Sequence, residues 1–224
     1  MSKLIHAIWL GKKMPPLSHA CVNDWKKQGY EVKLWTDSSE QVLSWIDECE
    51  FTKECYKRGL YAFVSDYLRI RILFEFGGLY LDTDVTIVRN PFQLFSDCDF
   101  CVGRENDSLI GTASIFAKRS NEVLSKLLGF YKNDIMSSTL YMGPDIMTQV
   151  LEEYNDDSTV RILDTEYFFS YQGQAIEFTH PENAYLIHWY QHTWENNEIP
   201  YLKSKHKGLL GKLYEYQKPL FRWK

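Results

Sequence analysis

Segments with the two-residue period of a strand and segments with the period of a helix alternate along the first fifty residues. An apolar run at 3–10 and an alternating run at 30–35 predict two strands. A turn at 11–16 and a short helix at 23–29 separate them, and a helix at 40–49 follows, with capping residues at 36–39. Strands that alternate with helices predict an α/β chain in which parallel strands share one sheet.

The second half continues in the same manner. We predict strands at 99–102 and 113–116 separated by Gly111-Thr112, helices at 121–131 and 146–154, a polar loop at 155–158, and a strand at 160–163. A last strand from Ala184 leads into a cluster of His188, His192, Thr193 and Trp194. This cluster either closes a metal or diphosphate site or packs as an aromatic core.

The run at 60–90 carries the strongest signal. Residues 60–76 contain no Gly or Pro and are followed by Gly77-Gly78, which predicts a helix ended by a left-handed glycine. Asp66 and Arg69 fall on its apolar face, whereas Arg71 and Glu75 form a solvated pair on the other face. Because an unpaired buried charge is costly, Asp66 and Arg69 need each other or a ligand.

A short strand at 79–81 ends at Asp82 and Asp84, and 85–88 resumes strand-like composition. Residues two apart at a strand end point the same way, so both carboxylates can face one cation. Hard oxygen donors suit Mg²⁺ or Mn²⁺ together with substrate phosphates. Ligands of α/β sheets bind beyond the carboxyl ends of the strands, so Trp9 is either a base-stacking platform near this metal or a core residue.

Length and composition limit the possibilities. The 224 residues suffice for a single domain, which we place at 1–202. No apolar run approaches the roughly 20 residues of a membrane span, and the N-terminal run is too short for a signal peptide. Five scattered cysteines, with Cys98 and Cys101 expected on opposite faces of a strand, predict free thiols and a cytoplasmic protein.

The segment 203–224 differs from the rest in charge. It holds seven Lys or Arg against one Glu, a net charge of +6, which leaves −11 on the remaining residues of a chain whose total is −5. Leucines and aromatic residues are interleaved with these cations. Such a tail is typical of an interfacial contact with anionic lipid at the inner face of a membrane, or of a docked C-terminal helix. The acidic body argues against nucleic acid as a partner.

Three motifs together resemble a known family: Ile5-His6-Ala7-Ile8-Trp9-Leu10-Gly11, Ser65-Asp66-x-x-Arg69 and Gly77-Gly78-x-Tyr80-x-Asp82-x-Asp84. They resemble the DXD-containing glycosyltransferases of family 32, which are related to the glucosylating clostridial toxins and to yeast α-mannosyltransferases. The stretches at 143–144 and 188–194 are similar more loosely. The small size resembles the bacterial members that build capsule, exopolysaccharide or lipopolysaccharide.

The resemblance implies a glycosyltransferase A-type fold with a Rossmann-like mixed sheet, a nucleotide-sugar donor (a UDP-sugar is favoured), Mn²⁺ or Mg²⁺, and transfer with retention of anomeric configuration. It implies a glycan or polyprenyl-diphosphate-linked saccharide as acceptor. By this resemblance, Trp9 would stack on the nucleobase, Asp84 would bind the metal directly, and Asp82 would bind the ribose or bind the metal through water. Asp66 and Arg69 would contact the donor sugar, with Tyr80 beside them. Thr193 and Trp194 would close over the diphosphate. His192 departs from the family pattern there and is a third candidate metal ligand.

The metal would stabilise charge on the departing diphosphate, and no carboxylate stands out as a nucleophile on the opposite face of the sugar. We therefore predict front-side attack by the acceptor, under loops at 104–111 and 190–199 that exclude water. Two alternatives stay open. The segment 79–86 also fits a haloacid-dehalogenase phosphohydrolase with Asp82 as nucleophile, although 81 residues precede Asp82. The other alternative is a sugar-nucleotide-binding module without turnover.

Overall fold

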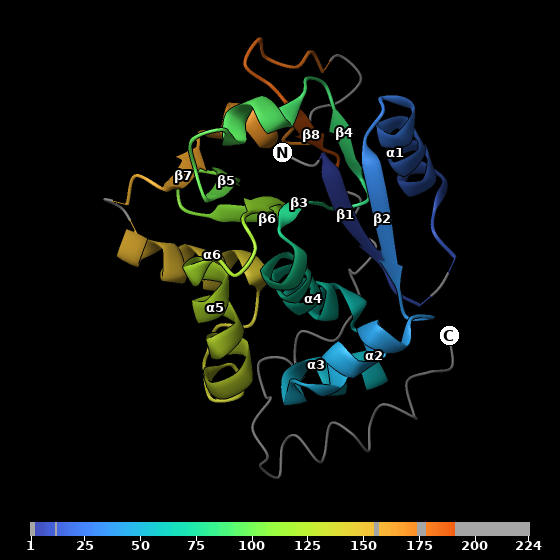
Figure 1. Ribbon diagram of the computed structural model, residues 1–224, viewed down its shortest axis with the longest axis vertical. Helices are drawn as coiled ribbons and strands as arrows, with labels where there is room; N and C mark the ends of the chain where they lie inside the picture. Colours follow the sequence, from blue (N-terminus) through green and yellow to red (C-terminus); the bar gives the residue numbers. More distant parts are fainter. Residues whose placement is uncertain (1–2, 12, 155–156, 174–177, 191–224) are drawn as a thin grey trace.

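A computed structural model describes residues 3–11, 13–154, 157–173 and 178–190 (Figure 1). The cluster at 192–194 and the tail at 203–224 therefore lie outside the described residues. The elements follow in the order β1 (Leu4–Trp9), α1 (Pro16–Lys27), β2 (Glu31–Thr36), α2 (Glu40–Asp47), α3 (Glu50–Lys57), α4 (Tyr61–Phe76), β3 (Gly78–Leu81), β4 (Val85–Ile87), a 3₁₀ turn (Pro91–Phe95), β5 (Phe100–Arg104), β6 (Ile110–Ala117), α5 (Glu122–Gly129), a π turn (Phe130–Asp134), α6 (Gly143–Leu151), a 3₁₀ turn (Glu152–Tyr154), β7 (Val160–Leu163), α7 (Thr165–Phe168) and β8 (Leu186–His188).

Six strands form one mixed sheet in the order β2-β1-β3-β6-β5-β7. The pairs β1–β2, β1–β3 and β5–β7 are parallel, and β6 is antiparallel to both β3 and β5. The parallel half follows from the strand–helix–strand crossovers, while β6 reverses direction after a short connection from β5. The predicted α/β class with a mixed sheet flanked by helices is confirmed.

Hydrophobic cores on the two faces explain why the strands are apolar at nearly every position. Side chains of β3 alternate between them, because Tyr80 faces one core and Leu79 and Leu81 face the other. The first core is shared with α2 to α6, and the second with α1, α7 and the β4–β8 pair. Figure 1 shows α4 beneath the sheet with α2 and α3 below it, and α1 and β4 on the opposite side.

Helix α4 lies at the centre of the first core and is buried on most of its sides. It ends at Gly77, whose positive φ of 65° favours glycine as predicted, although its ψ of −174° is extended and not that of a left-handed helical residue. A Cβ at Gly77 would also lie 2.7 Å from the Arg119 backbone nitrogen. The chain therefore turns directly from α4 into β3, and the helix that carries Asp66 and Arg69 is joined without a loop to the strand that leads to Asp82.

The structure corrects three details of the sequence prediction. Helix α1 begins at Pro16, well before the predicted start, because proline supplies the φ of a first helical turn. Gly111 and Thr112 lie inside β6 rather than between strands. The side chains of Cys98 and Cys101 do not lie on opposite faces of the sheet; both pack in the second core, because Cys98 precedes β5 and strand alternation does not reach it.

All five cysteines are free and buried, as predicted. Within the described ranges, no helix is both long enough and apolar enough to cross a bilayer. A separate two-stranded sheet pairs β4 with β8 in antiparallel register, with Val85 opposite His188. This small sheet is the element that completes the site described next.

Candidate active site

The Asp82-Thr83-Asp84 segment is a tight turn at the end of β3. The Val85 N–H donates to the Asp82 carbonyl at 3.1 Å, which closes the turn, and the Asp82 N–H donates to Ala113 on β6 at 2.8 Å. Aspartate is favoured at the first position of such turns. The Thr83 hydroxyl points away from the two carboxylates and donates to Ser18 of α1 at 3.1 Å. The two aspartates therefore face the same side, as predicted, although a turn and not a continued strand places them there.

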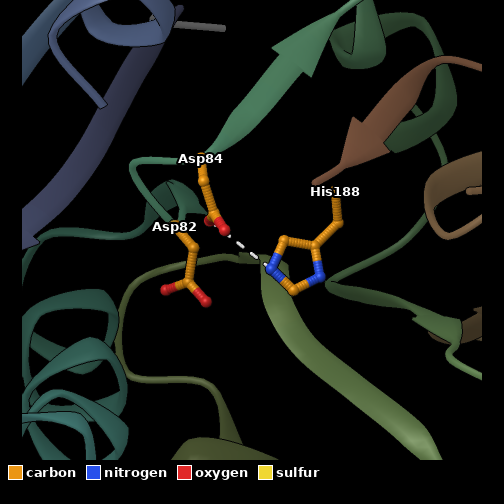
Figure 2. A group of neighbouring side chains, drawn as sticks. All are labelled: Asp82, Asp84 and His188. Carbon is orange, nitrogen blue, oxygen red and sulfur yellow. Dashed lines mark ion pairs between the residues drawn. The ribbon is translucent and has the colours of Figure 1, made fainter. Parts of the chain in front are cut away.

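His188 faces both aspartates from the neighbouring strand β8. Its register opposite Val85 and a hydrogen bond from the Trp189 N–H to the Asp84 carbonyl at 3.1 Å hold it there. Nε2 of His188 lies 3.4 Å from Asp84 Oδ1 (Figure 2). One donor atom from each of Asp82, Asp84 and His188 lies within 4.8 Å of the others. Two strands that are distant in the sequence thus build a single cluster of three ligands.

Electrostatics within this cluster favour positive charge. Burial by itself would lower the pKa of His188, but the hydrogen bond and the negative charge of Asp84 outweigh it, so the pKa lies above its ordinary value. Nδ1 of His188 is buried and has no hydrogen-bond partner among the described residues. The imidazole therefore uses Nε2, the nitrogen that Figure 2 shows directed at the carboxylates. A positive charge placed among these three groups would be stabilised.

The cluster fits a divalent cation. Carboxylate oxygens suit Mg²⁺, Ca²⁺ and Mn²⁺, and imidazole nitrogen suits the transition metals. Two carboxylates and one imidazole together match Mn²⁺ better than Mg²⁺, which prefers oxygen donors throughout. We predicted His192 as the nitrogen ligand; it lies outside the described residues, and the histidine that the structure brings to Asp84 is His188. The pairing of β4 with β8, which the sequence does not reveal, brings His188 to the site.

Asp66 and Arg69 are buried on α4 beside the cluster. Arg69 Nη2 lies 3.1 Å from Asp66 Oδ1 and 3.4 Å from Asp82 Oδ1, so one guanidinium links both carboxylates. The Gly143 N–H, at the start of α6, donates to the other oxygen of Asp66 at 3.1 Å. Burial raises the pKa of Asp66, and Arg69 opposes that shift. The pair is thus both a structural ion pair and part of the site, the two interpretations that the sequence left open.

Tyr80 is predicted to lie beside the donor sugar, but the structure buries it, with 1% of its surface exposed. Its hydroxyl donates to Asp82 Oδ1 at 2.6 Å, and its ring lies 4.9 Å from the Arg69 guanidinium carbon. Tyr80 therefore holds the Asp82 carboxylate in place through this hydrogen bond. The observed contact of Tyr80 is thus with Asp82, because the alternation of β3 directs the ring into the core beneath α4.

Trp9 ends β1 at the same edge of the sheet as Asp82 and is partly exposed, not core. The turn after it is held tightly. The Gly11 N–H donates to Asp37 at 2.9 Å, and Tyr56 donates to the same carboxylate oxygen at 3.1 Å. Gly11 has a φ of 76°, and a Cβ there would lie 2.1 Å from the Tyr61 ring. Trp9 thus stands on a fixed turn and keeps part of its surface exposed.

Comparison with known proteins shows what this chain is similar to. Residues 15–111 match the family model described as "glycosyltransferase sugar-binding region containing DXD motif". The chain is 26% identical over 157 residues to subversion of eukaryotic traffic protein A of Legionella pneumophila, covering 57% of this chain and 24% of that protein. It is also 26% identical over 149 residues to mouse lactosylceramide 4-alpha-galactosyltransferase, covering 66% of this chain and 38% of that enzyme. The chain thus spans between a quarter and two fifths of these two relatives.

Among solved structures, the PaToxG glycosyltransferase superposes with a TM-score of 0.52 at 19% identity, covering 69% of each chain. The predicted A-type fold is confirmed by this likeness, which concerns architecture alone. The predicted resemblance to DXD-containing glycosyltransferases is confirmed by the family match. The motif Asp82-Thr83-Asp84 lies inside the matched residues, and His188 lies outside them.

Proposed function

We propose that the chain is a retaining glycosyltransferase, which moves a hexose from a nucleotide sugar to a glycan or lipid-linked saccharide. One observation carries this proposal: Asp82, Asp84 and His188 converge within 4.8 Å, beside the Asp66–Arg69 pair, in a chain that carries the DXD sugar-binding region. A UDP-sugar is the favoured donor. The likeness of the three sequence motifs to the family supports this choice.

Asp84 and His188 are the residues we assign to direct metal binding, with Asp82 as the third ligand, and Mn²⁺ is the favoured ion. When bound, the ion supplies Lewis-acid stabilisation of the charge that develops on the diphosphate leaving group. The protein contributes a fixed arrangement of ligands, because Asp84 and His188 are joined through backbone pairing of β4 with β8. Preformed ligands require little reorganisation when the donor enters.

The other residues bind and orient the donor. Trp9 is proposed to stack on the nucleobase, since it is partly exposed at the carboxyl end of β1. Asp66 is proposed to accept hydrogen bonds from the hydroxyls of the sugar. Asp66, Asp82 and Asp84 are each engaged with Arg69, Tyr80 or His188, which supports binding roles for them and not attack on the sugar. Retention by front-side attack of the acceptor hydroxyl is consistent with these roles.

Water must be kept from the bound donor. The hairpin loop at 105–109 joins β5 to β6 at the edge of the sheet that carries Asp82. The Asn106 side chain accepts hydrogen bonds from Ser108 and from the Leu109 N–H. Gln172 donates to the Glu105 carbonyl at 3.2 Å, which ties the loop to the segment after α7. We assign this loop, together with Thr193 and Trp194, to closure over the diphosphate.

A saccharide is the proposed acceptor. The mouse relative is a lactosylceramide galactosyltransferase, and lactosylceramide is a glycolipid. That relative supports an acceptor in which a sugar is attached to lipid, as in the polyprenyl-diphosphate-linked intermediates of bacterial capsule, exopolysaccharide or lipopolysaccharide synthesis. The cationic tail at 203–224 suits such an acceptor at an anionic inner membrane face.

A donor screen tests the proposal. Purified protein is incubated with Mn²⁺ and a panel of nucleotide sugars, and release of nucleoside diphosphate is followed with Asp84→Ala alongside. We expect metal-dependent release from one donor, with the free sugar or glycoside formed first in the anomeric configuration of that donor, and at least about 100-fold slower release by the variant. Proton NMR of the anomeric hydrogen reads the stereochemistry directly.

The same screen separates the alternatives. Phosphate released from simple phosphomonoesters, and lost in Asp82→Asn, would replace the proposal with a phosphohydrolase. Tight binding of a nucleotide sugar without hydrolysis or transfer to any saccharide would indicate a binding module without turnover. Either outcome contradicts the transferase.

A further inference from the structure

Every nitrogen of the Arg69 guanidinium is engaged inside the protein. Nε donates to the Ser65 carbonyl at 3.2 Å, and Nη1 donates to the carbonyl and hydroxyl of Thr112 at 2.7 and 3.0 Å. Nη2 lies between the carboxylates of Asp66 and Asp82. The residue is 5% exposed, and the Tyr80 ring covers part of the guanidinium. Arginine has no further nitrogen to offer a sugar.

The two oxygens of Asp82 are used unequally. Oδ1 accepts from the Tyr80 hydroxyl at 2.6 Å and lies 3.4 Å from Arg69 Nη2. Oδ2 has no partner among the described residues, and the side chain keeps 27% of its surface exposed. Protein contacts on Oδ1 fix the rotation of the carboxylate. They leave Oδ2 as the atom that faces a ligand.

Thr112 connects this arrangement to the sheet. It lies in β6, which pairs with β3 through Leu81 and Ser114, so its carbonyl and hydroxyl are held by the strand next to the one that ends at Asp82. Both bonds from Arg69 Nη1 reach this one residue. The planar fork of arginine matches such paired acceptors, and the compact ammonium of lysine does not.

Resting on the proposed function, we infer that Arg69 is a positioning residue and not a contact of the donor sugar, and that Thr112 is its anchor. Arg69 and Tyr80 hold Asp82 Oδ1, so that Oδ2 is presented to the divalent cation. Removing a residue that hydrogen-bonds to a metal ligand commonly lowers metal affinity by about 10- to 100-fold. Arg69 therefore acts on the metal centre through Asp82, and on the sugar only through Asp66.

The test measures Mn²⁺ binding to the full chain without any donor, from the paramagnetic resonance signal of the free ion. Arg69→Lys retains the positive charge and removes the fork, Thr112→Val removes only the hydroxyl, and Tyr80→Phe removes the other contact to Oδ1. Ser114→Ala is the matched control, because Ser114 lies two residues along the same strand, is fully buried, and has a hydroxyl without a hydrogen-bond partner in the described part of the chain. Circular dichroism confirms that each variant is folded.

We expect Mn²⁺ affinity to fall about 10-fold in Arg69→Lys and Tyr80→Phe and about 3-fold or more in Thr112→Val, and to stay unchanged in Ser114→Ala. Wild-type affinity for Mn²⁺ in Arg69→Lys, with a raised KM for the donor, would overturn the inference and assign Arg69 to the sugar. Mn²⁺ binding by the wild type without turnover of any donor would contradict the proposed function while the inference stands. A wild type that does not bind Mn²⁺ would overturn both.

Discussion

At the scale of single residues, His6 shows that a motif residue can serve the fold and not the site. Its Nε2–H donates to the Gly77 carbonyl at 3.0 Å, and its Nδ1 accepts from the Trp35 indole at 3.1 Å. The ring is fully buried, and burial lowers its pKa to about 4. His6 is therefore neutral and ties β1 to the turn that ends α4, at the edge of the sheet opposite the site.

A pH dependence of stability follows from this pKa. The unfolded chain binds a proton at His6 near pH 6.5, whereas the folded chain does so only near pH 4, so the contribution of neutral His6 is lost as the pH falls through this window. The free energy of unfolding falls by about 3 kcal/mol between pH 7.5 and pH 4 for this reason. Urea unfolding at both pH values measures it. His6→Gln keeps a hydrogen-bond donor and an acceptor but does not titrate. We therefore expect the unfolding free energy of this variant to fall by about 3 kcal/mol less than that of the wild type between the two pH values. An equal fall in both proteins would show that His6 is not the source of the pH dependence.

His188 is the residue on which the metal site depends most. We expect His188→Ala to lower Mn²⁺-dependent release of nucleoside diphosphate about 100-fold, because the substitution removes one of three ligands from a preformed cluster. His180→Ala is the control, since His180 is exposed and its ring contacts the carbonyl of the neighbouring Pro181. A rate within twofold of wild type in His188→Ala would exclude His188 as a ligand.

At the scale of elements, the start of α6 is placed by contact with Asp66. A Cβ on Gly143 would lie 2.7 Å from both Cγ and Oδ1 of Asp66, closer than real Cβ contacts. We expect Gly143→Ala to displace the carboxylate and to reduce kcat/KM for the donor about 10-fold or more. Gly129→Ala is the matched control, because nothing lies within 4 Å of that Cβ. The control keeps full activity and gains about 0.5–1 kcal/mol in unfolding free energy.

Gly11, in the turn after β1, can be compared with Gly29, which follows α1. Gly11 and Gly29 both have positive φ, but only a Cβ at Gly11 would meet a neighbour, the Tyr61 ring. Gly11→Ala therefore combines backbone strain with displacement of the turn that carries Trp9, and we expect the KM for the donor to rise about 10-fold with kcat nearly unchanged. Gly29→Ala brings strain alone, so its KM stays at the wild-type value. Equal KM values in the two variants would show that the turn does not position the nucleoside end.

The elements nearest the motif were the most predictable from the sequence. The predicted helix at 60–76, the glycine stop and the strand at 79–81 agree with α4, Gly77 and β3, because local composition and a glycine with positive φ decide them. The pairing of β8 with β4 was not predictable, since 98 residues separate Ile87 and Leu186 and neither strand carries a register signal. The predicted ligand His192 lies outside the described residues and stays a prediction, and neither Thr112 nor Gly143 was recognised as a partner of the buried charges.

At the scale of the whole molecule, charge is distributed unevenly along the chain. The last 22 residues carry +6 and the remainder −11. We propose that this tail contacts anionic lipid, each cation contributing about 1 kcal/mol near the surface. Sedimentation with vesicles of phosphatidylserine and phosphatidylcholine tests it. Four substitutions to Glu, at Lys203, Lys205, Lys207 and Lys212, are expected to weaken binding at least about 100-fold and to leave donor hydrolysis unchanged.

Vesicles of pure phosphatidylcholine serve as the lipid control and should bind neither protein. Equal sedimentation of the wild type and the four-site variant with anionic vesicles would contradict an electrostatic contact. Loss of donor hydrolysis in the variant would instead place the tail at the active site.

The central claim is that Asp82, Asp84 and His188 form the metal centre at which the donor diphosphate binds. Anomalous diffraction from a crystal of the full chain with Mn²⁺ and a nucleoside diphosphate at the manganese absorption edge tests it most directly. We predict one strong peak bounded by Asp82 Oδ2, an oxygen of Asp84 and His188 Nε2, with the diphosphate on its open side and the base against Trp9. A peak elsewhere, or a bound nucleotide with no manganese between these three residues, would contradict the account.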